Sequence, residues 1–321
     1  MIPASSPLPR PALLAPFLAR QPFLVLDGGL ATELERQGFD LADPLWSARV
    51  LMDTPQAIRT VHCDYLRAGA DVITGASYQA TTQALVARGL TAGQAEAILR
   101  RSVALATEAR EEFLAGSSAT ERLPPLVAAS IGPYGAWRAD GSEYRGDYGL
   151  TGRELAAFHR PRFEILAEAG ADLLAIETIP SRREAEALVD LMEAHGQVRG
   201  WLSFTTRDGA AIADGTPFAE CVEALSQAPS VVAIGVNCTP AERVTPLLRS
   251  AAAVTTKPFI VYPNAGGEYD GLAHAWRGEA SDEAIPRQAG EWHELGARLI
   301  GGCCRTTPRT IDQLRDRMAA R

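Results

Sequence analysis

Short apolar runs alternate with amphipathic stretches along the whole chain, and this alternation predicts the secondary structure. The apolar runs are rich in Val, Ile, Leu and Ala and show no strict polar alternation. Such runs are typical of parallel strands that are buried on both faces. Eight strands are predicted, at Phe23–Asp27, Asp71–Gly75, Leu126–Ile131, Asp172–Glu177, Gly200–Thr205, Val231–Asn237, Phe259–Tyr262 and Ala297–Gly301.

The amphipathic stretches between these runs predict helices. Proline occupies the first turn of several of them, and Gly69 and Gly170 stand between a helix and the next strand, where a helix-ending glycine belongs. The helical patterns cover Pro55–Ala68, Ala92–Leu114, Gly152–Ala169, Arg182–Glu193, Pro217–Gln227, Pro240–Ala252, Pro286–Leu295 and Pro308–Ala319. Strand and helix therefore alternate through the chain.

This alternation predicts an α/β fold, a (β/α)8 or TIM barrel. No linker-like change of composition interrupts the eight strand–helix units. A doubly wound open sheet is the alternative, but the glycine-rich dinucleotide turn is missing after the first strand. We expect a proline-rich N-terminal tail or cap at residues 1–21 and a single barrel domain at residues 22–321.

Composition and charge exclude several classes of function. Hydrophobic residues make up 46% and charged residues 22% of the 321 residues, so a full core can be buried. The net charge is −8 and the Lys and Arg residues are scattered among acids, so no basic patch for nucleic acid is indicated. No run approaches the roughly 18 apolar residues that span a bilayer. We expect a cytoplasmic protein, where the reducing environment leaves cysteines free for metals or catalysis.

Three cysteines fall at the carboxyl ends of predicted strands, which is where such barrels carry their active sites. Cys238 follows the sixth strand, and Cys303 and Cys304 follow the eighth. Only the seventh strand separates these ends, so the three thiolates are expected to share a metal. Three sulfur ligands favour Zn²⁺ and leave one position open, as in catalytic zinc sites. His274 and His293 are candidates for a fourth ligand, but neither falls at a strand end.

Other side chains at the same rim are candidates for binding a substrate. Glu177 ends the fourth strand, and we expect this carboxylate to bind a cation or a substrate amine. Asp27 is weaker evidence, because Asp-Gly-Gly is also an ordinary turn. Cys63 and Cys221 lie on helical patterns and are interpreted as small buried hydrophobic residues. Six aromatic residues either line a pocket for a cation or serve packing alone: Tyr78, Tyr134, Trp137, Tyr144, Tyr148 and Tyr262.

A zinc ion with three thiolates suits one kind of chemistry in particular. Its net charge is about −1, which makes it a poor activator of water, but it can still bind a substrate thiol and displace its proton. The bound sulfur remains nucleophilic and suits attack on a cationic electrophile such as a sulfonium methyl group. The residues thus predict zinc-activated alkylation of a thiol, without naming the thiol.

Four motifs resemble those of the homocysteine S-methyltransferase family, and the similarity extends from Phe23 to the C-terminus. They are Leu26-Asp27-Gly28-Gly29, Gly75-Ala76-Ser77-Tyr78-Gln79-Ala80-Thr81, Gly235-Val236-Asn237-Cys238 and Gly301-Gly302-Cys303-Cys304-Arg305. Two further segments resemble the bacterial and plant branch that uses S-methylmethionine. These segments are 132–135, with the sequence Gly-Pro-Tyr-Gly, and 140–148, with the sequence Asp-Gly-Ser-Glu-Tyr-Arg-Gly-Asp-Tyr.

The resemblance implies a zinc ion held by Cys238, Cys303 and Cys304, with the sulfur of homocysteine as the fourth ligand. The reaction would transfer a methyl group to homocysteine and give methionine. Its small-molecule partners would be homocysteine and a sulfonium donor, either S-methylmethionine or S-adenosylmethionine.

The resemblance also implies roles for residues around the metal. Asp27 and the backbone of Gly28 and Gly29 would hold the amino-acid end of homocysteine. Glu177 would pair with the ammonium group of homocysteine, and Asn237 would orient the metal site from behind its ligands.

Several alternatives remain at this level. Betaine is a third donor, although the enzymes that use it have longer chains. A metal-dependent aldolase or hydrolase would use His and carboxylate ligands, and the histidines do not cluster at strand ends. A zinc or thiol-binding barrel without catalysis is the non-enzymatic alternative. A corrinoid partner would require further domains, and the sequence indicates no oligomeric state.

Overall fold

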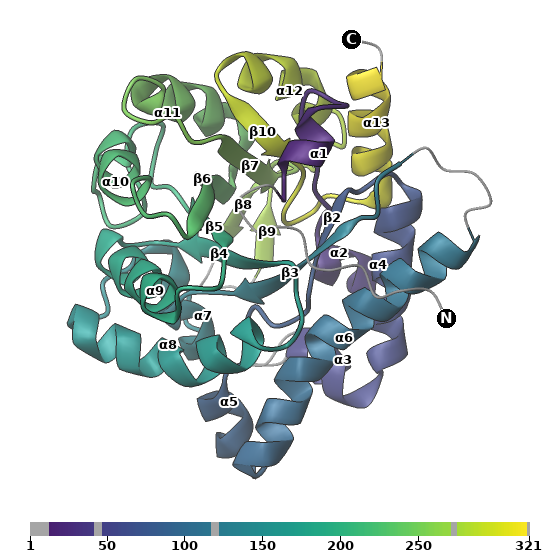
Figure 1. Cartoon of the computed structure of the whole chain (residues 1–321), viewed down its shortest axis with the longest axis vertical. Coiled ribbons are helices and arrows are strands. Elements are labelled where there is room, and N and C mark those ends of the chain that lie inside the picture. Colours follow the sequence, from purple (N-terminus) through teal and green to yellow (C-terminus); the bar gives the residue numbers. More distant parts are fainter. Residues whose placement is uncertain (1–12, 42–46, 117–121, 271–274, 320–321) are drawn as a thin grey trace.

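Eight parallel strands form a barrel, which confirms the predicted fold (Figure 1). The structure is a computed structural model that describes residues 13–41, 47–116, 122–270 and 275–319. The barrel strands are β1 (Leu24–Val25), β2 (Val72–Thr74), β3 (Leu126–Ile131), β4 (Leu173–Ile179), β5 (Gly200–Phe204), β6 (Val231–Pro240), β7 (Phe259–Asn264) and β10 (Ala297–Ile300). Their order around the sheet is β1-β10-β7-β6-β5-β4-β3-β2.

The helices that follow the strands form the outer layer. They are α4 (Pro55–Arg67), α6 (Ala92–Gly116), α8 (Gly152–Ala167), α9 (Arg182–His195), α10 (Phe218–Leu225), α11 (Val244–Ala251), α12 (Ala284–Glu294) and α13 (Pro308–Ala319). The prediction of a helix from Pro240 was wrong at its start, because β6 continues through Pro240 and a 3-10 turn, η3 (Ala241–Arg243), precedes α11. Among the described residues, no helix is both long and apolar enough to cross a membrane.

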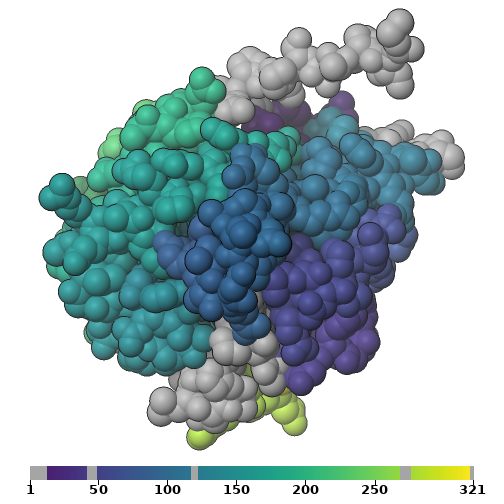
Figure 2. Space-filling model, turned by 90° about the horizontal axis from the view of Figure 1, so that it is seen from below, coloured from purple at the N-terminus to yellow at the C-terminus, as the bar shows by residue number. Residues whose placement is uncertain are grey.

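Additional short elements were not predicted from the sequence. They are α1 (Ala15–Leu18), α2 (Leu30–Arg36), α3 (Ser47–Asp53), α5 (Thr82–Ala87), α7 (Tyr134–Arg138), the 3-10 turn η2 (Ser142–Tyr144) and a hairpin of β8 (Glu268–Asp270) and β9 (Ala275–Arg277). All except α1 lie in connections that leave the carboxyl end of a barrel strand. Figure 2 shows α5 at the surface, between the purple segments of the first unit and the teal helices further along the chain. The additional elements therefore gather at the carboxyl end of the barrel strands, where barrels of this kind carry their active sites.

Two apolar layers hold the barrel together. One lies between the sheet and the helices, and the other fills the barrel interior with residues such as Leu26, Trp201 and Leu299. Leu14 and Phe17, from α1 and the residue before it, are buried in this inner layer, and Figure 1 shows α1 lying across the strands near α12 and α13. The division into a tail or cap at 1–21 and a barrel at 22–321 stays a prediction.

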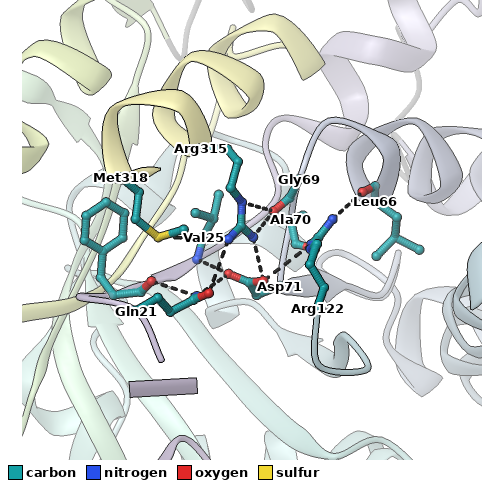
Figure 3. Close-up of polar contacts among 10 residues, drawn as sticks. Gln21, Val25, Leu66, Gly69, Ala70, Asp71, Arg122, Arg315 and Met318 are labelled. Carbon is teal, nitrogen blue, oxygen red and sulfur yellow. Dashed lines mark hydrogen bonds and ion pairs between the residues drawn. The ribbon is translucent and has the colours of Figure 1, made fainter. Parts of the chain in front are cut away.

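The seam between β1 and β2 closes through side chains as well as backbone. A single parallel bridge, between Leu26 and Val72, joins the two strands directly. At the amino end of the seam, the buried carboxylate of Asp71 accepts a hydrogen bond from the backbone N–H of Val25, at 2.9 Å. The same carboxylate pairs with Arg315 of α13 at 2.5 Å and with Arg122 at 3.4 Å (Figure 3). Asp71 therefore links the first strand to the last helix.

Replacing Asp71 with alanine is expected to lower the free energy of unfolding by about 3 kcal/mol, because it leaves two partly buried guanidinium groups without their carboxylate. Urea denaturation measures this difference. The matched control is Glu112→Ala, which removes an exposed carboxylate paired with Arg59 and is expected to cost less than about 1 kcal/mol. Equal losses in the two variants would contradict the role given to Asp71.

Candidate metal and substrate site

The three predicted cysteines lie together at the carboxyl end of the barrel. Cys238 is near the end of β6, and Cys303 and Cys304 follow β10. The Sγ atom of Cys304 lies 3.6 Å from that of Cys238 and 4.0 Å from that of Cys303, and all three sulfurs lie within 4.8 Å of one another. Sulfurs on a tetrahedral zinc ion, with bonds of about 2.3 Å, are roughly 3.8 Å apart. The spacing therefore fits a single zinc ion.

Unusual backbone conformations place these side chains in the barrel mouth. Thr178, Cys238 and Arg305 have positive φ angles of 59°, 48° and 64°, which non-glycine residues rarely adopt. The strand register also shifts after Ile176 in β4 and after Asn237 in β6. Such irregularities re-aim side chains, and strained backbone clusters at functional sites. The strain here coincides with the cysteine cluster.

Two glycines allow the first and last barrel strands to meet behind the cysteines. A Cβ atom on Gly29 would lie 2.7 Å from the carbonyl oxygen of Cys303, and one on Gly302 would lie 2.4 Å from Oγ1 of Thr306. The N–H of Gly29 donates to the same Thr306 hydroxyl at 3.0 Å. Close approach therefore explains these glycines, and the homocysteine contacts predicted for Gly28 and Gly29 stay a prediction.

Asn237 is fully buried and connects the strands beneath the cysteines. Its Oδ1 accepts hydrogen bonds from the N–H of Thr178 at 2.7 Å and the hydroxyl of Ser203 at 2.8 Å. Its Nδ2 donates to the Oγ1 of Thr178 at 2.8 Å and faces Sγ of Cys303 at 3.9 Å. This is the contact through which Asn237 would orient a metal ligand.

Glu177 is a buried carboxylate at the end of β4. Ser130 and Tyr262 donate hydrogen bonds to it, and the first of these bonds is short. Burial raises the pKa of Glu177 to about 7, because these hydrogen bonds do not offset desolvation and the nearby Cys238 adds negative charge. A cationic group that reached this carboxylate would restore its charged form.

Asp27 lies at the same rim and has a structural contact. Its Oδ2 accepts from the N–H of Thr74 at 2.7 Å, and its Oδ1 accepts from the hydroxyl of Thr74 at 3.3 Å. Burial, with a smaller contribution from the charge of Glu177, raises the pKa of Asp27 to about 8. Asp27 therefore closes the β1–β2 seam at the mouth, and its contact with homocysteine stays a prediction.

The cysteine thiols interact with one another. Cys303 and Cys304 donate hydrogen bonds that hold the pKa of Cys238 well below its usual range, and the same interactions raise their own pKa values. The hydroxyl of Tyr144 also lies 3.5 Å from Sγ of Cys238. Cys63 and Cys221 are buried on α4 and α10, away from this cluster, which confirms their interpretation as hydrophobic residues.

The six candidate aromatic residues divide into different environments. Tyr144 contacts Cys238, and Tyr262 hydrogen-bonds to Ser203 at 2.6 Å and to Trp201 at 2.9 Å. Packing accounts for three others, Tyr134, Trp137 and Tyr148, whose rings meet one another or Phe158 in tilted or edge-on contacts at centroid distances of 4.8 to 5.4 Å. The ring of the sixth, Tyr78, packs against Gly132, where an added Cβ atom would lie 2.7 Å from it. Of the candidate fourth ligands, His293 lies in α12 with its ring 6.1 Å from Phe23, and His274 lies outside the described residues.

Comparison with known proteins identifies the family of this chain. A sequence profile described as Homocysteine S-methyltransferase matches residues 24–318. The chain belongs to the homocysteine S-methyltransferase family. It is 49% identical to homocysteine S-methyltransferase YbgG of Bacillus subtilis over 91% of this chain and 93% of that protein. It is 46% identical to homocysteine S-methyltransferase 2 of Arabidopsis thaliana over 93% of this chain and 94% of that protein.

A solved structure supports the same assignment to the family. The metallated form of the homocysteine methyltransferase MmuM from Escherichia coli aligns with a TM-score of 0.85 at 48% identity. The alignment covers 95% of this chain and 99% of that chain. The protein is therefore a methyltransferase, and its fold and family agree with the resemblance seen in the sequence motifs.

Proposed function

We propose that the protein transfers a methyl group from S-methylmethionine to the thiol of L-homocysteine, and that Cys238, Cys303 and Cys304 hold the zinc ion this reaction uses. The observation that carries the proposal is the sulfur triangle, whose edges of 3.6 and 4.0 Å fit a zinc tetrahedron. The metallated MmuM structure supports a metal in this family. S-Adenosylmethionine is the alternative donor.

The chain's own residues bind and orient the acceptor. A zinc ion held by Cys238, Cys303 and Cys304 would supply the acidity that makes the homocysteine thiol a nucleophilic thiolate at neutral pH. Glu177 pairs with the ammonium group of homocysteine, which fixes the amino-acid end of this substrate. Asn237 holds Cys303 in place, because its amide is itself fixed by Thr178 and Ser203.

Methyl transfer then needs only alignment of the two sulfur atoms. The bond between the methyl carbon and the donor sulfur breaks, and its electron pair stays on the leaving sulfur as a neutral thioether. The new bond forms from the homocysteine sulfur, so S-methylmethionine and homocysteine give two molecules of methionine. Opposite charges are neutralised in this step, and the buried mouth, which excludes water from Glu177 and Asp27, favours it.

The deciding experiment follows methionine formation from homocysteine with S-methylmethionine and S-adenosylmethionine as parallel donors. We expect turnover with S-methylmethionine in preference, one zinc per chain, loss of activity after treatment with a chelator and recovery when zinc is added. A protein that binds zinc yet uses neither donor would contradict the proposal and favour a non-catalytic zinc barrel. Preference for S-adenosylmethionine would contradict the donor alone.

A further inference from the structure

A third carboxylate, the half-buried Glu143, lies near the cysteine cluster and has no function in the reaction described so far. It belongs to η2, in the connection between β3 and α8. Its Oε2 atom is buried and no described residue gives it a hydrogen-bond partner. A buried carboxylate oxygen without a partner is costly, so it calls for a ligand.

Close packing fixes Glu143 in this position. A Cβ atom on Gly135 would lie 2.3 Å from the backbone nitrogen of Glu143, so η2 rests directly on α7. The next residue, Tyr144, reaches Sγ of Cys238 at 3.5 Å. The turn that carries Glu143 is therefore held between α7 and a predicted metal ligand.

The cation nearest in sequence has other partners. The guanidinium of Arg145 pairs with Asp147 at 3.3 Å and donates to the carbonyl oxygen of Gly141 at 3.4 Å. Burial raises the pKa of Glu143 to about 7, and the negative charge of Cys238 adds to this shift. The charge of Arg145 and a backbone hydrogen bond favour the charged carboxylate but do not offset its burial, and neither supplies a partner for Oε2.

Asp27 and Glu177, the other two carboxylates of the site, differ from Glu143 in the partners of their oxygens. Asp27 is bound on both oxygens by Thr74, and Glu177 accepts from Ser130 and Tyr262. Only Glu143, among these three, has a buried oxygen with no partner. The proposed reaction brings together two amino acids, and each carries an ammonium group.

We propose that Glu143 binds the ammonium group of the methyl donor and so selects donors that are amino acids. This inference rests on the proposed function, in which Glu177 binds the ammonium group of homocysteine. An ammonium group supplies the N–H donor that Oε2 lacks, whereas a sulfonium centre has none. Cationic donors without an amino group would leave Oε2 unpaired and would bind more weakly.

The test compares wild-type protein with Glu143→Gln, which keeps the shape of the side chain and removes its charge. We expect the KM for S-methylmethionine to rise roughly 10- to 150-fold, the range for loss of a charged hydrogen bond. Dimethylsulfoniopropionate has the same sulfonium and carboxylate groups without an amino group. Its inhibition constant as a competitor of S-methylmethionine is expected to change less than about twofold.

The matched control is Asp147→Asn, which removes one exposed negative charge from the same connection and is expected to leave both constants unchanged. Zinc content and the KM for homocysteine should be unchanged in Glu143→Gln, which separates donor binding from a general disturbance of the site. If the wild-type protein turned over S-methylmethionine but Glu143→Gln had the same KM for it, this inference would be overturned and the proposed function would stand. Equal weakening of both sulfonium compounds would also overturn it. A wild-type protein inactive with every donor would overturn the proposed function together with it.

Discussion

A Cys304→Ala variant is expected to lose stoichiometric zinc and to lower kcat/KM for methyl transfer to homocysteine by a factor on the order of 10³ or more. Cys304 lies 3.6 Å from Cys238 and 4.0 Å from Cys303, so its removal leaves two sulfurs for an ion that needs three protein ligands. The homocysteine thiol would then be mostly protonated at neutral pH and no longer held for attack. Zinc analysis and initial rates measure the two effects.

The control for this variant is Cys221→Ala, which alters a buried cysteine on α10 outside the cluster. It is expected to keep one zinc per chain and to affect activity only through stability. If Cys304→Ala retained stoichiometric zinc and wild-type turnover, the three-cysteine site would be wrong. A protein that lost zinc but kept its activity would show instead that the metal is structural.

Much of the barrel could be predicted because its signals are local. Strand β3 has the predicted bounds, and Gly69 and Gly170 both have the positive φ angles expected where a helix ends before a strand. Strand β1 was predicted at Phe23–Asp27 but is limited to Leu24–Val25. The difference arises at the β1–β2 seam, where side-chain carboxylates replace part of the strand pairing, and no local pattern encodes such a contact.

The metal ligands could be predicted for a topological reason. Two strands on either side of a common neighbour end close together in a barrel. The barrel fold therefore predicts that Cys238 lies near Cys303 and Cys304. The supporting residues could not be predicted in this way. Ser203 lies inside the run predicted as a strand at Gly200–Thr205, and nothing in that run indicates its hydrogen bond to Asn237. Tyr144 was one of the six candidate aromatic residues, but its contact with Cys238, 94 positions further along the chain, was not predicted. Their roles depend on tertiary contacts that a single sequence does not specify.

The second large effect is expected for Glu177→Gln, which should raise the dissociation constant of homocysteine roughly 30-fold or more. The variant replaces a buried carboxylate by a neutral amide, and loss of one partner of a buried charge pair costs about 2 kcal/mol or more. Calorimetry of homocysteine binding to the zinc-loaded protein measures this change. Glu164→Gln, which alters an exposed side chain on α8, is the control and should bind homocysteine as the wild type does.

The pH dependence separates the charge of Glu177 from its shape. The pKa of Glu177 is raised to about 7 in the free protein, and a bound ammonium group lowers it again, because the charged carboxylate pairs with the cation. Below about pH 7, binding therefore releases a proton from Glu177 in addition to the thiol proton of homocysteine. As the pH falls below about 7, the logarithm of the wild-type affinity for homocysteine should drop up to about twice as steeply per pH unit as that of Glu177→Gln. The variant releases only the thiol proton on binding. Parallel pH curves for the two proteins would show that the charge of Glu177 does not contribute to homocysteine binding. The ammonium group would then need another partner at the mouth, and Asp27 is the candidate that the sequence motif offers.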